Sequence, residues 1–155
     1  MTGLQSVQEV AEAFNAEYQV RLGDTVHFCD DGDSLVHELK GNVLQCAVTN
    51  GTAIAQHKKL RLSGLDQVLD YIFISDELGV EKPNEGFFDK VWQTIGQFEK
   101  DEVMIVGDSL TSDIRGGNNA GIVTCWYNPK GLAKTVDVMI DHEIQNLQQI
   151  REILK

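Results

Sequence analysis

The chain has 155 residues, of which 42% are hydrophobic and 24% charged, and its formal net charge is −11. This composition describes one globular domain that can bury a core without disulfides or a structural metal, and it excludes disordered, collagen-like and disulfide-scaffold proteins. The negative charge repels a phosphate backbone, so we expect no nucleic acid polymer as a partner.

The cysteines and the N-terminus bear on location. The three cysteines stand far apart and form no paired spacing for zinc or for disulfide exchange. The sequence has no basic region followed by an apolar stretch at its start, and no run of 18 apolar residues. We therefore predict a cytoplasmic protein that is neither exported nor inserted in a membrane.

Helices and strands are predicted in alternation along the chain. Apolar residues at helical spacing predict a helix over about 4–20, and a second helix follows that Asp31 or Asp33 can cap and Gly41 ends. The next predicted elements are, in order, a strand at 43–48, a helix at 53–62, a strand at 71–74, a helix at 86–95, a strand at 103–106, a helix at 110–120 and a strand at 122–127. An edge strand at 136–140 and a final helix carrying Ile144, Leu147, Ile150 and Leu154 complete the pattern.

Short apolar strands that alternate with helices predict βαβ units, and therefore the α/β fold class with a parallel sheet and helices on both faces. In such sheets the ligand binds outside the carboxyl ends of the strands. Thr49 and Asn50 follow one strand, Asp108 follows another, and the loop after a third leads through Ser75, Asp76 and Glu77 to Lys82. A hydroxyl, an amide, an ammonium and a carboxylate are thus expected on one rim.

These residue types match the needs of a phosphate monoester. Thr49 can donate a hydrogen bond to a phosphoryl oxygen, and backbone N–H groups of the Asn50-Gly51 turn can add to it. Lys82 would supply a compact cation. Asp108 and Asp113 bring carboxylate oxygens that suit a hydrated Mg²⁺. We expect a small phosphorylated metabolite as the partner.

Three segments, in this order, resemble motifs two, three and four of the haloacid dehalogenase superfamily phosphatases: AVTNG at 47–51, GVEKPN at 79–84 and IVGDSLTSDIRGG at 105–117. The segment AGIVTCWYNP at 120–129 is similar to the branch that contains 5′-nucleotidases acting on nucleoside monophosphates.

The resemblance implies a Rossmann-like three-layer αβα core over residues 26–155, incomplete at its N-terminus, and residues 1–25 resemble the end of a helical cap. It implies a hydrolase in which Thr49 and Lys82 are catalytic, in which Asn50 and Gly51 join them in binding phosphate, and in which Asp108 and Asp113 hold Mg²⁺. It leaves the substrate open, because the cap that selects it is mostly absent.

The match departs from the family at motif one, a strand ending in D-x-D-x-T whose first Asp attacks phosphorus and whose second is the general acid and base. Asp31-x-Asp33 is the nearest candidate, but these residues fit the start of a capped helix better.

Two functions stay open: a phosphohydrolase that carries motifs two to four, or a non-catalytic fragment or phosphate-binding pseudoenzyme. The letters GDSL at 107–110 also occur in an esterase family, but the D-x-x-H which that family needs later is absent.

By resemblance, the strand that would carry motif one is central, between the strands that end at Val48 and Val106. Its absence would leave two rows of backbone groups unpaired. These strands could pair with each other, receive a segment near 20–28, or receive a strand from a missing N-terminal piece or a second chain. We expect the supplied strand, and we expect the chain to be a truncated form of a longer protein.

Overall fold

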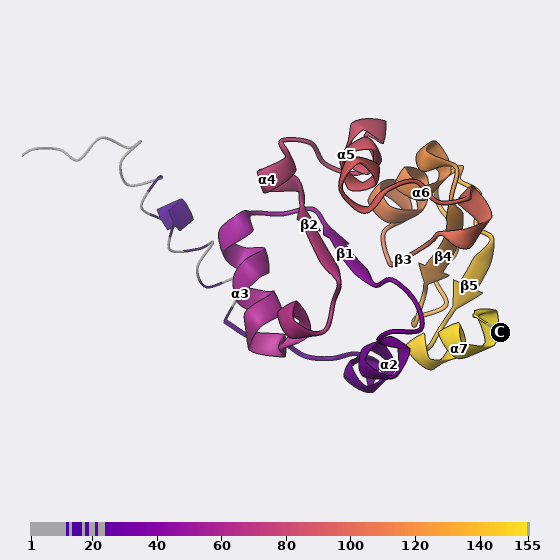
Figure 1. Cartoon of the computed structure of the whole chain (residues 1–155), viewed down its shortest axis with the longest axis horizontal. Coiled ribbons are helices and arrows are strands. Elements are labelled where there is room, and N and C mark those ends of the chain that lie inside the picture. Colours follow the sequence, from indigo (N-terminus) through magenta and orange to yellow (C-terminus); the bar gives the residue numbers. More distant parts are fainter. Residues whose placement is uncertain (1–11, 13, 17, 19–20, 22–23, 155) are drawn as a thin grey trace, which may run out of the picture.

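The computed structural model describes residues 12, 14–16, 18, 21 and 24–154. Strands and helices alternate through the described residues (Figure 1). The strands are β1 (Cys46–Thr49), β2 (Tyr71–Ile74), β3 (Met104–Gly107), β4 (Val123–Tyr127) and β5 (His142–Ile144). The helices are α2 (Gly32–Leu39), α3 (Ala53–Ser63), α4 (Ser75–Leu78), α5 (Glu85–Ile95), α6 (Arg115–Ala120) and α7 (Ile150–Ile153). Shorter helical turns cover Leu65–Gln67, Lys100–Glu102, Leu110–Ile114 and Leu147–Gln149.

The strands form two parallel sheets. In the first, β1 pairs with β2, and Thr49 lies opposite Ile74. In the second, the order is β3, β4, β5, and Gly107 lies opposite Trp126. Every strand pair is parallel, so the predicted α/β class is confirmed. Within the described residues, β1 and β3 are not hydrogen-bonded to each other.

Helices cover both faces of these sheets. Helix α5 packs on one face, where Phe87, Phe88 and Val91 contact Phe73 of β2 and Ile105 of β3. This cluster joins the two sheets through one helix. Helices α2 and α7 cover the other face of the second sheet, with a buried cluster of Leu35, Cys125, Ile144 and Ile150. Figure 1 shows α5 and α6 above the strands and α2 and α7 below them, as the three-layer arrangement requires.

Most of the central helices and strands lie where the sequence predicts them. The predicted bounds differ from the structure at the N-terminal helix and at the start of β1. The predicted helix at 4–20 falls largely outside the described residues, of which Glu12, 14–16, Tyr18 and Arg21 are helical. Strand β1 begins at Cys46 and not at residue 43. Val43 N donates to Leu39 O at 3.2 Å, because this segment closes the end of α2 before the strand starts.

The start of α2 is predicted correctly, but Asp31 does not cap it. Asp31 stands at the N-cap position with a left-handed backbone, φ 56°, and its side chain makes no capping bond. Asp33 lies in the first helical turn. Residue Asp30 anchors the turn instead, since its Oδ2 accepts from Tyr127 Oη at 2.8 Å and from Leu147 N at 3.1 Å.

The C-terminal prediction is wrong in two places. Residues 136–140 form no strand, because Met139 N and O bond to the side chain of Asn118 and not to a strand. The edge strand is β5, which includes Ile144. Helical structure begins only after Asn146, whose side chain shares a capping box with Gln149. Among the described residues, no helix is long and apolar enough to cross a lipid bilayer.

Candidate functional site

A tight turn follows β1 and leads into α3. Gly51 has φ +143°, a backbone conformation that residues with a Cβ rarely adopt, so this position favours glycine. Gly51 N donates to Ser75 Oγ at 3.0 Å, and the same hydroxyl lies 3.4 Å from Gly51 O. Ser75 is buried at the end of β2. The hydroxyl of Ser75 therefore fixes the turn, and it occupies the Gly51 N–H that the sequence assigns to phosphate.

Asn50 is bonded to the backbone of Lys82. Its Nδ2 donates to Lys82 O at 2.8 Å, and Lys82 N donates to its Oδ1 at 2.9 Å. The peptide between Lys82 and Pro83 is cis. Both functional groups of the Asn50 side chain are thus engaged with one residue, which positions Lys82 rather than a ligand in this structure.

The side chain of Lys82 is only 5% exposed. Its Nζ donates to Val48 O at 2.6 Å and to Asp113 Oδ1 at 2.6 Å, and it lies 6.0 Å from the centre of the Phe87 ring. The structure therefore brings Lys82 and Asp113 together at the carboxyl end of β1. A buried ion pair of this kind is sensitive to the loss of either partner, because the remaining charge is left unpaired.

Asp113 is held in place by the end of β3. Its Oδ2 accepts from Ser109 N at 3.1 Å, and its side chain is 13% exposed. A Cβ on Gly107 would lie 2.4 Å from Asp113 Cγ, so glycine at 107 makes room for this carboxylate. Both oxygens of Asp113 are engaged by the protein.

Asp108 differs from Asp113 in being exposed. Its carbonyl accepts from Trp126 Nε1 at 3.0 Å, which fixes its backbone at the end of β3. No described residue bonds to its carboxylate. A single exposed carboxylate suits Mg²⁺, which usually keeps several waters and binds one or two carboxylates together with substrate phosphate. Asp108 therefore fits a hydrated Mg²⁺, although the described residues contain no group of three acidic, histidine or cysteine side chains arranged around a metal.

The other acidic candidates lie elsewhere. Asp33 Oδ1 lies 3.2 Å from His37 Nδ1, and its side chain is 47% exposed. Asp31 is exposed beside it at the start of α2. Neither follows a strand, so the interpretation of 31–33 as a helix start agrees with the structure.

Three consecutive residues after β2 connect that strand to α3 and the turn before it, whereas the sequence predicts them only as part of a loop. Besides the bonds of Ser75, Asp76 Oδ2 accepts from Ala53 N at 2.9 Å and Glu77 Oε1 lies 2.7 Å from His57 Nε2. A strand followed by one hydroxyl and two acids is the signal that could have indicated these contacts, since hydroxyl and carboxylate oxygens readily accept from free N–H groups at the start of a helix.

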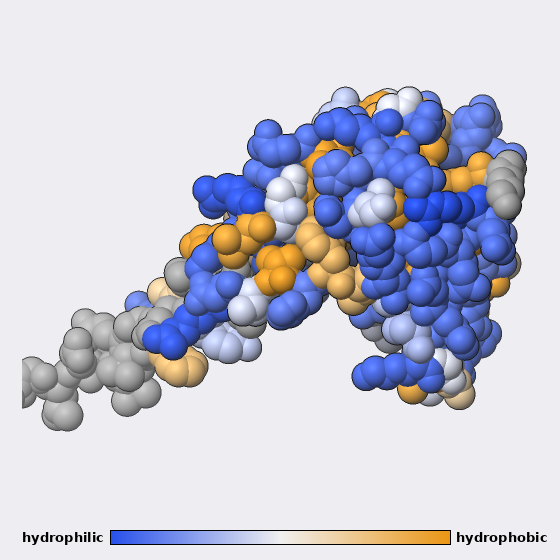
Figure 2. Space-filling view, turned by 90° about the horizontal axis from the view of Figure 1, so that it is seen from below, coloured by the Kyte–Doolittle hydropathy of each residue, from blue (hydrophilic) through white to orange (hydrophobic). Residues whose placement is uncertain are grey.

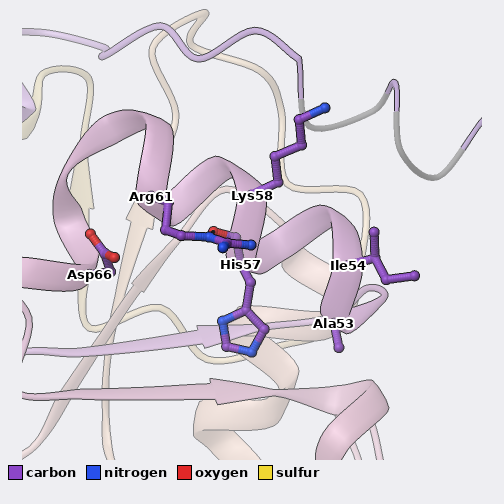
Figure 3. Close-up of a pocket in the computed structure, with 6 residues that line it drawn as sticks. All are labelled: Ala53, Ile54, His57, Lys58, Arg61 and Asp66. Carbon is purple, nitrogen blue, oxygen red and sulfur yellow. Dashed lines mark hydrogen bonds between the residues drawn. The ribbon is translucent and has the colours of Figure 1, made fainter.

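A shallow pocket lies on the outer face of α3 and contains none of the predicted site residues. Figure 3 shows Ala53, Ile54, His57, Lys58, Arg61 and Asp66 around it. Two of its basic side chains have acidic partners, since His57 contacts Glu77 and Lys58 pairs with Asp24. The third, Arg61, donates from its Nε to the backbone oxygen of His57 at 3.4 Å. The pocket is therefore a polar helix face whose charges are partly compensated.

Comparison with known proteins shows which family this chain resembles. The chain matches the family described as haloacid dehalogenase-like hydrolase over residues 2–127. The pyrimidine 5′-nucleotidase PynA of Streptococcus pneumoniae is 41% identical over 108 residues, which cover 70% of this chain and 46% of that protein. The pyrimidine 5′-nucleotidase YjjG of Escherichia coli is 39% identical over 120 residues, which cover 74% of this chain and 53% of that protein.

A solved structure of a similar protein has the same fold. The crystal structure of the HAD-hydrolase YfnB from Bacillus subtilis, bound to magnesium, matches with a TM-score of 0.88 at 33% identity and covers 99% of this chain and 66% of that one. The chain spans about half the length of the curated relatives it matches.

Proposed function

Because this chain belongs to the haloacid dehalogenase-like hydrolases, we propose that its carboxyl rim binds the phosphate group of a phosphate monoester. Two relatives carry the name pyrimidine 5′-nucleotidase, so we propose nucleoside 5′-monophosphates as the substrate class. The observation that carries the proposal is the buried Lys82 ammonium, held between Val48 O and Asp113 beside Thr49.

Each residue has a separate task in this proposal. Lys82 supplies the positive charge for the phosphoryl oxygens. The Thr49 hydroxyl lies 3.3 Å from Asn50 O, a long bond that it can exchange for a phosphoryl oxygen. Asp108 holds Mg²⁺ through its exposed carboxylate. Asp113, which the resemblance also assigns to Mg²⁺, is paired with Lys82 in this structure and keeps that ammonium in place. Mg²⁺, when bound, offsets the repulsion between the phosphate and these acids.

The covalent step needs a carboxylate that attacks phosphorus. In the part of the chain that the structure describes, Asp31 and Asp33 belong to the start of α2, and by resemblance Asp108 and Asp113 serve the metal. This observation favours the second candidate function, a phosphate-binding protein without catalysis of its own. The two candidates share one phosphate site.

Phosphate binding is the direct test. Inorganic phosphate is titrated into the protein with and without Mg²⁺ and followed by ³¹P NMR or calorimetry. We expect binding that Mg²⁺ strengthens, and we expect Thr49→Val to weaken it by about tenfold or more, as loss of a hydrogen bond to a charged group does. The matched control is Thr94→Val, an exposed threonine of α5 whose hydroxyl bonds to Lys90 O. Absence of binding to the unmodified chain, or equal effects of the two variants, would contradict the proposal.

We also propose a cytoplasmic location. The cysteines Cys29, Cys46 and Cys125 are free thiols, as is usual where glutathione keeps thiols reduced.

A further inference from the structure

The turn that follows β1 contains the pair Asn50-Gly51, and Asn50 is the one asparagine of the chain that precedes a glycine. In such a pair the backbone nitrogen of the glycine can attack the side-chain amide carbon of the asparagine, because glycine has no Cβ to hinder the approach. This reaction is deamidation, and it needs no enzyme. The sequence alone therefore marks this turn as chemically reactive.

The hydrogen bonds of the turn oppose the reaction. Gly51 N donates to Ser75 Oγ at 3.0 Å, which holds the attacking nitrogen in place. Asn50 Nδ2 donates to Lys82 O at 2.8 Å, and Asn50 Oδ1 accepts from Lys82 N at 2.9 Å. The amide of Asn50 cannot turn toward Gly51 N without losing both of these bonds. Deamidation thus requires local opening of the turn.

Water, the second reactant, can reach the turn. Gly51 is exposed and Asn50 is half-buried. The face of the molecule in Figure 2 is likewise covered mostly by hydrophilic side chains, as expected for a net charge of −11. The hydrogen bonds of the turn, and not a lack of water, therefore limit the reaction.

We propose that Asn50-Gly51 is a deamidation site that Ser75 and Lys82 hold closed in the folded chain. When the turn opens, a bond forms between Gly51 N and Asn50 Cγ, the bond from Cγ to Nδ2 breaks, and ammonia leaves with the proton of Gly51 N. Water then opens the resulting cyclic imide. Attack of water on Cγ gives aspartate, and attack on the main-chain carbonyl carbon gives isoaspartate.

Either product changes the proposed phosphate site. A carboxylate cannot donate the hydrogen bond that Asn50 Nδ2 gives to Lys82 O. It also places a negative charge directly after Thr49, where it repels a phosphate group. Deamidation would therefore weaken phosphate binding. This consequence rests on the proposed function, whereas the reaction itself does not.

The first test compares the folded and the unfolded chain and needs no variant. The protein is incubated in mildly alkaline buffer with and without urea, and peptide mass spectrometry measures the deamidation rate at each asparagine. We expect Asn50 to react before the other asparagines in urea, and to react at least about tenfold more slowly in the folded chain. Equal rates at Asn50 in the two states, or no reaction at Asn50 in urea, would overturn the proposal.

Serine variants test how the turn is held closed. Ser75→Ala removes the acceptor of the Gly51 N–H and should raise the rate at Asn50 in the folded chain about fivefold, the factor that corresponds to one hydrogen bond. Ser63→Ala is the matched control, because Ser63 is also partly buried and its hydroxyl donates to Leu60 O. This control should leave the rate unchanged. Equal rates in the two folded variants would contradict the role of Ser75, and if Ser75→Ala does not fold, the comparison in urea decides.

The effect on phosphate is measured by titration of inorganic phosphate. Asn50→Asp reproduces the aspartate product and should weaken binding by about tenfold or more. Asn42→Asp adds the same charge at an exposed position before β1 and should leave binding unchanged. Equal affinities of these two variants would refute the proposed consequence. Absence of phosphate binding to the unmodified chain would refute the proposed function alone, because the deamidation rates are measured without phosphate.

Discussion

The polar residues next to the proposed phosphate site bond mainly to one another. Asn50 engages both backbone groups of Lys82, and Gly51 N–H engages Ser75. The lysine that would meet the phosphate is therefore fixed at its backbone by Asn50 and at its ammonium by Asp113. A buried cation held at both ends needs little reorganisation when a ligand arrives, which is the condition for effective electrostatic stabilisation.

Asn50→Ala should lower the free energy of unfolding by about 2 kcal/mol, because it leaves a partly buried N–H and C=O of Lys82 without partners. The measurement is urea denaturation monitored by Trp fluorescence. Asn42→Ala is the control, since the Asn42 amide donates only to Glu38 O at an exposed position, and its effect should be near zero. Equal losses in the two variants would show that Asn50 does not fix Lys82.

The contact between Tyr127 and Asp30 predicts a pH effect on stability. The hydrogen bond to the Asp30 carboxylate, followed by desolvation, raises the pKa of the Tyr127 phenol from 10 to about 12. The folded state thus retains the proton more strongly than the unfolded state. The stabilisation is complete below pH 10 and is lost as the pH rises toward 12.

The stability difference between the unmodified chain and Tyr127→Phe should therefore narrow as the pH rises above 10. Urea denaturation at several alkaline pH values measures it, with Tyr71→Phe as the control for loss of an exposed phenol. Cys46 and Cys125, whose pKa values burial raises to about 11, are present in every variant, so their contributions cancel. A difference that stays constant with pH would refute the assigned role of Asp30.

At the scale of elements, the packing of α6 on the sheet is closest at one glycine. A Cβ on Gly117 would lie 2.5 Å from Ile105 Cγ2 and 2.7 Å from Thr124 Cγ2, whereas a Cβ on Gly116 would lie 3.4 Å from Phe88. Gly117→Ala should thus destabilise the fold by about 1–3 kcal/mol through overpacking. Gly116→Ala should be neutral or stabilising, because alanine favours the helix by about 1 kcal/mol. Thermal unfolding distinguishes these adjacent positions, and similar melting temperatures would contradict the close packing.

Elements with strong apolar patterns could be predicted from the sequence, and those set by long-range side-chain bonds could not. The strands at 71–74 and 122–127 are short apolar runs rich in β-branched and aromatic residues, which are typical of buried strands. Residues 136–140 have a similar pattern, but hydrogen bonds from the side chain of Asn118 fix the backbone of this segment outside the sheet.

At the candidate site, too, some features could be predicted from the sequence and others could not. The convergence of Lys82 and Asp113 follows from parallel strands ending at one rim, whereas the roles of Asn50 and Ser75 depend on backbone geometry that spacing does not express.

At the scale of the whole molecule, the two sheets are joined without strand pairing between them in the part of the chain that the structure describes. The connection consists of α5, whose Phe87 and Phe88 contact both sheets, and of Lys82 across the carboxyl ends of β1 and β3. The proposed phosphate site lies on this junction.

The same geometry predicts that the chain by itself binds phosphate but has little or no phosphatase activity on nucleoside monophosphates. A cation and Mg²⁺ can orient and polarise the phosphate, but without an attacking carboxylate no phospho-enzyme forms. Release of inorganic phosphate from a nucleoside monophosphate, with Mg²⁺ present, measures the activity, and the binding titration of the same sample shows that the site is intact. Mg²⁺-dependent turnover that disappears in Asp31→Asn would refute the prediction and would identify Asp31-x-Asp33 as the nucleophile motif. Asp66→Asn, which changes an acid just after α3, is the matched control. Loss of turnover in both variants would indicate that they fail to fold. Loss of turnover only in Asp31→Asn would mean that α2 rearranges to bring Asp31 to the rim.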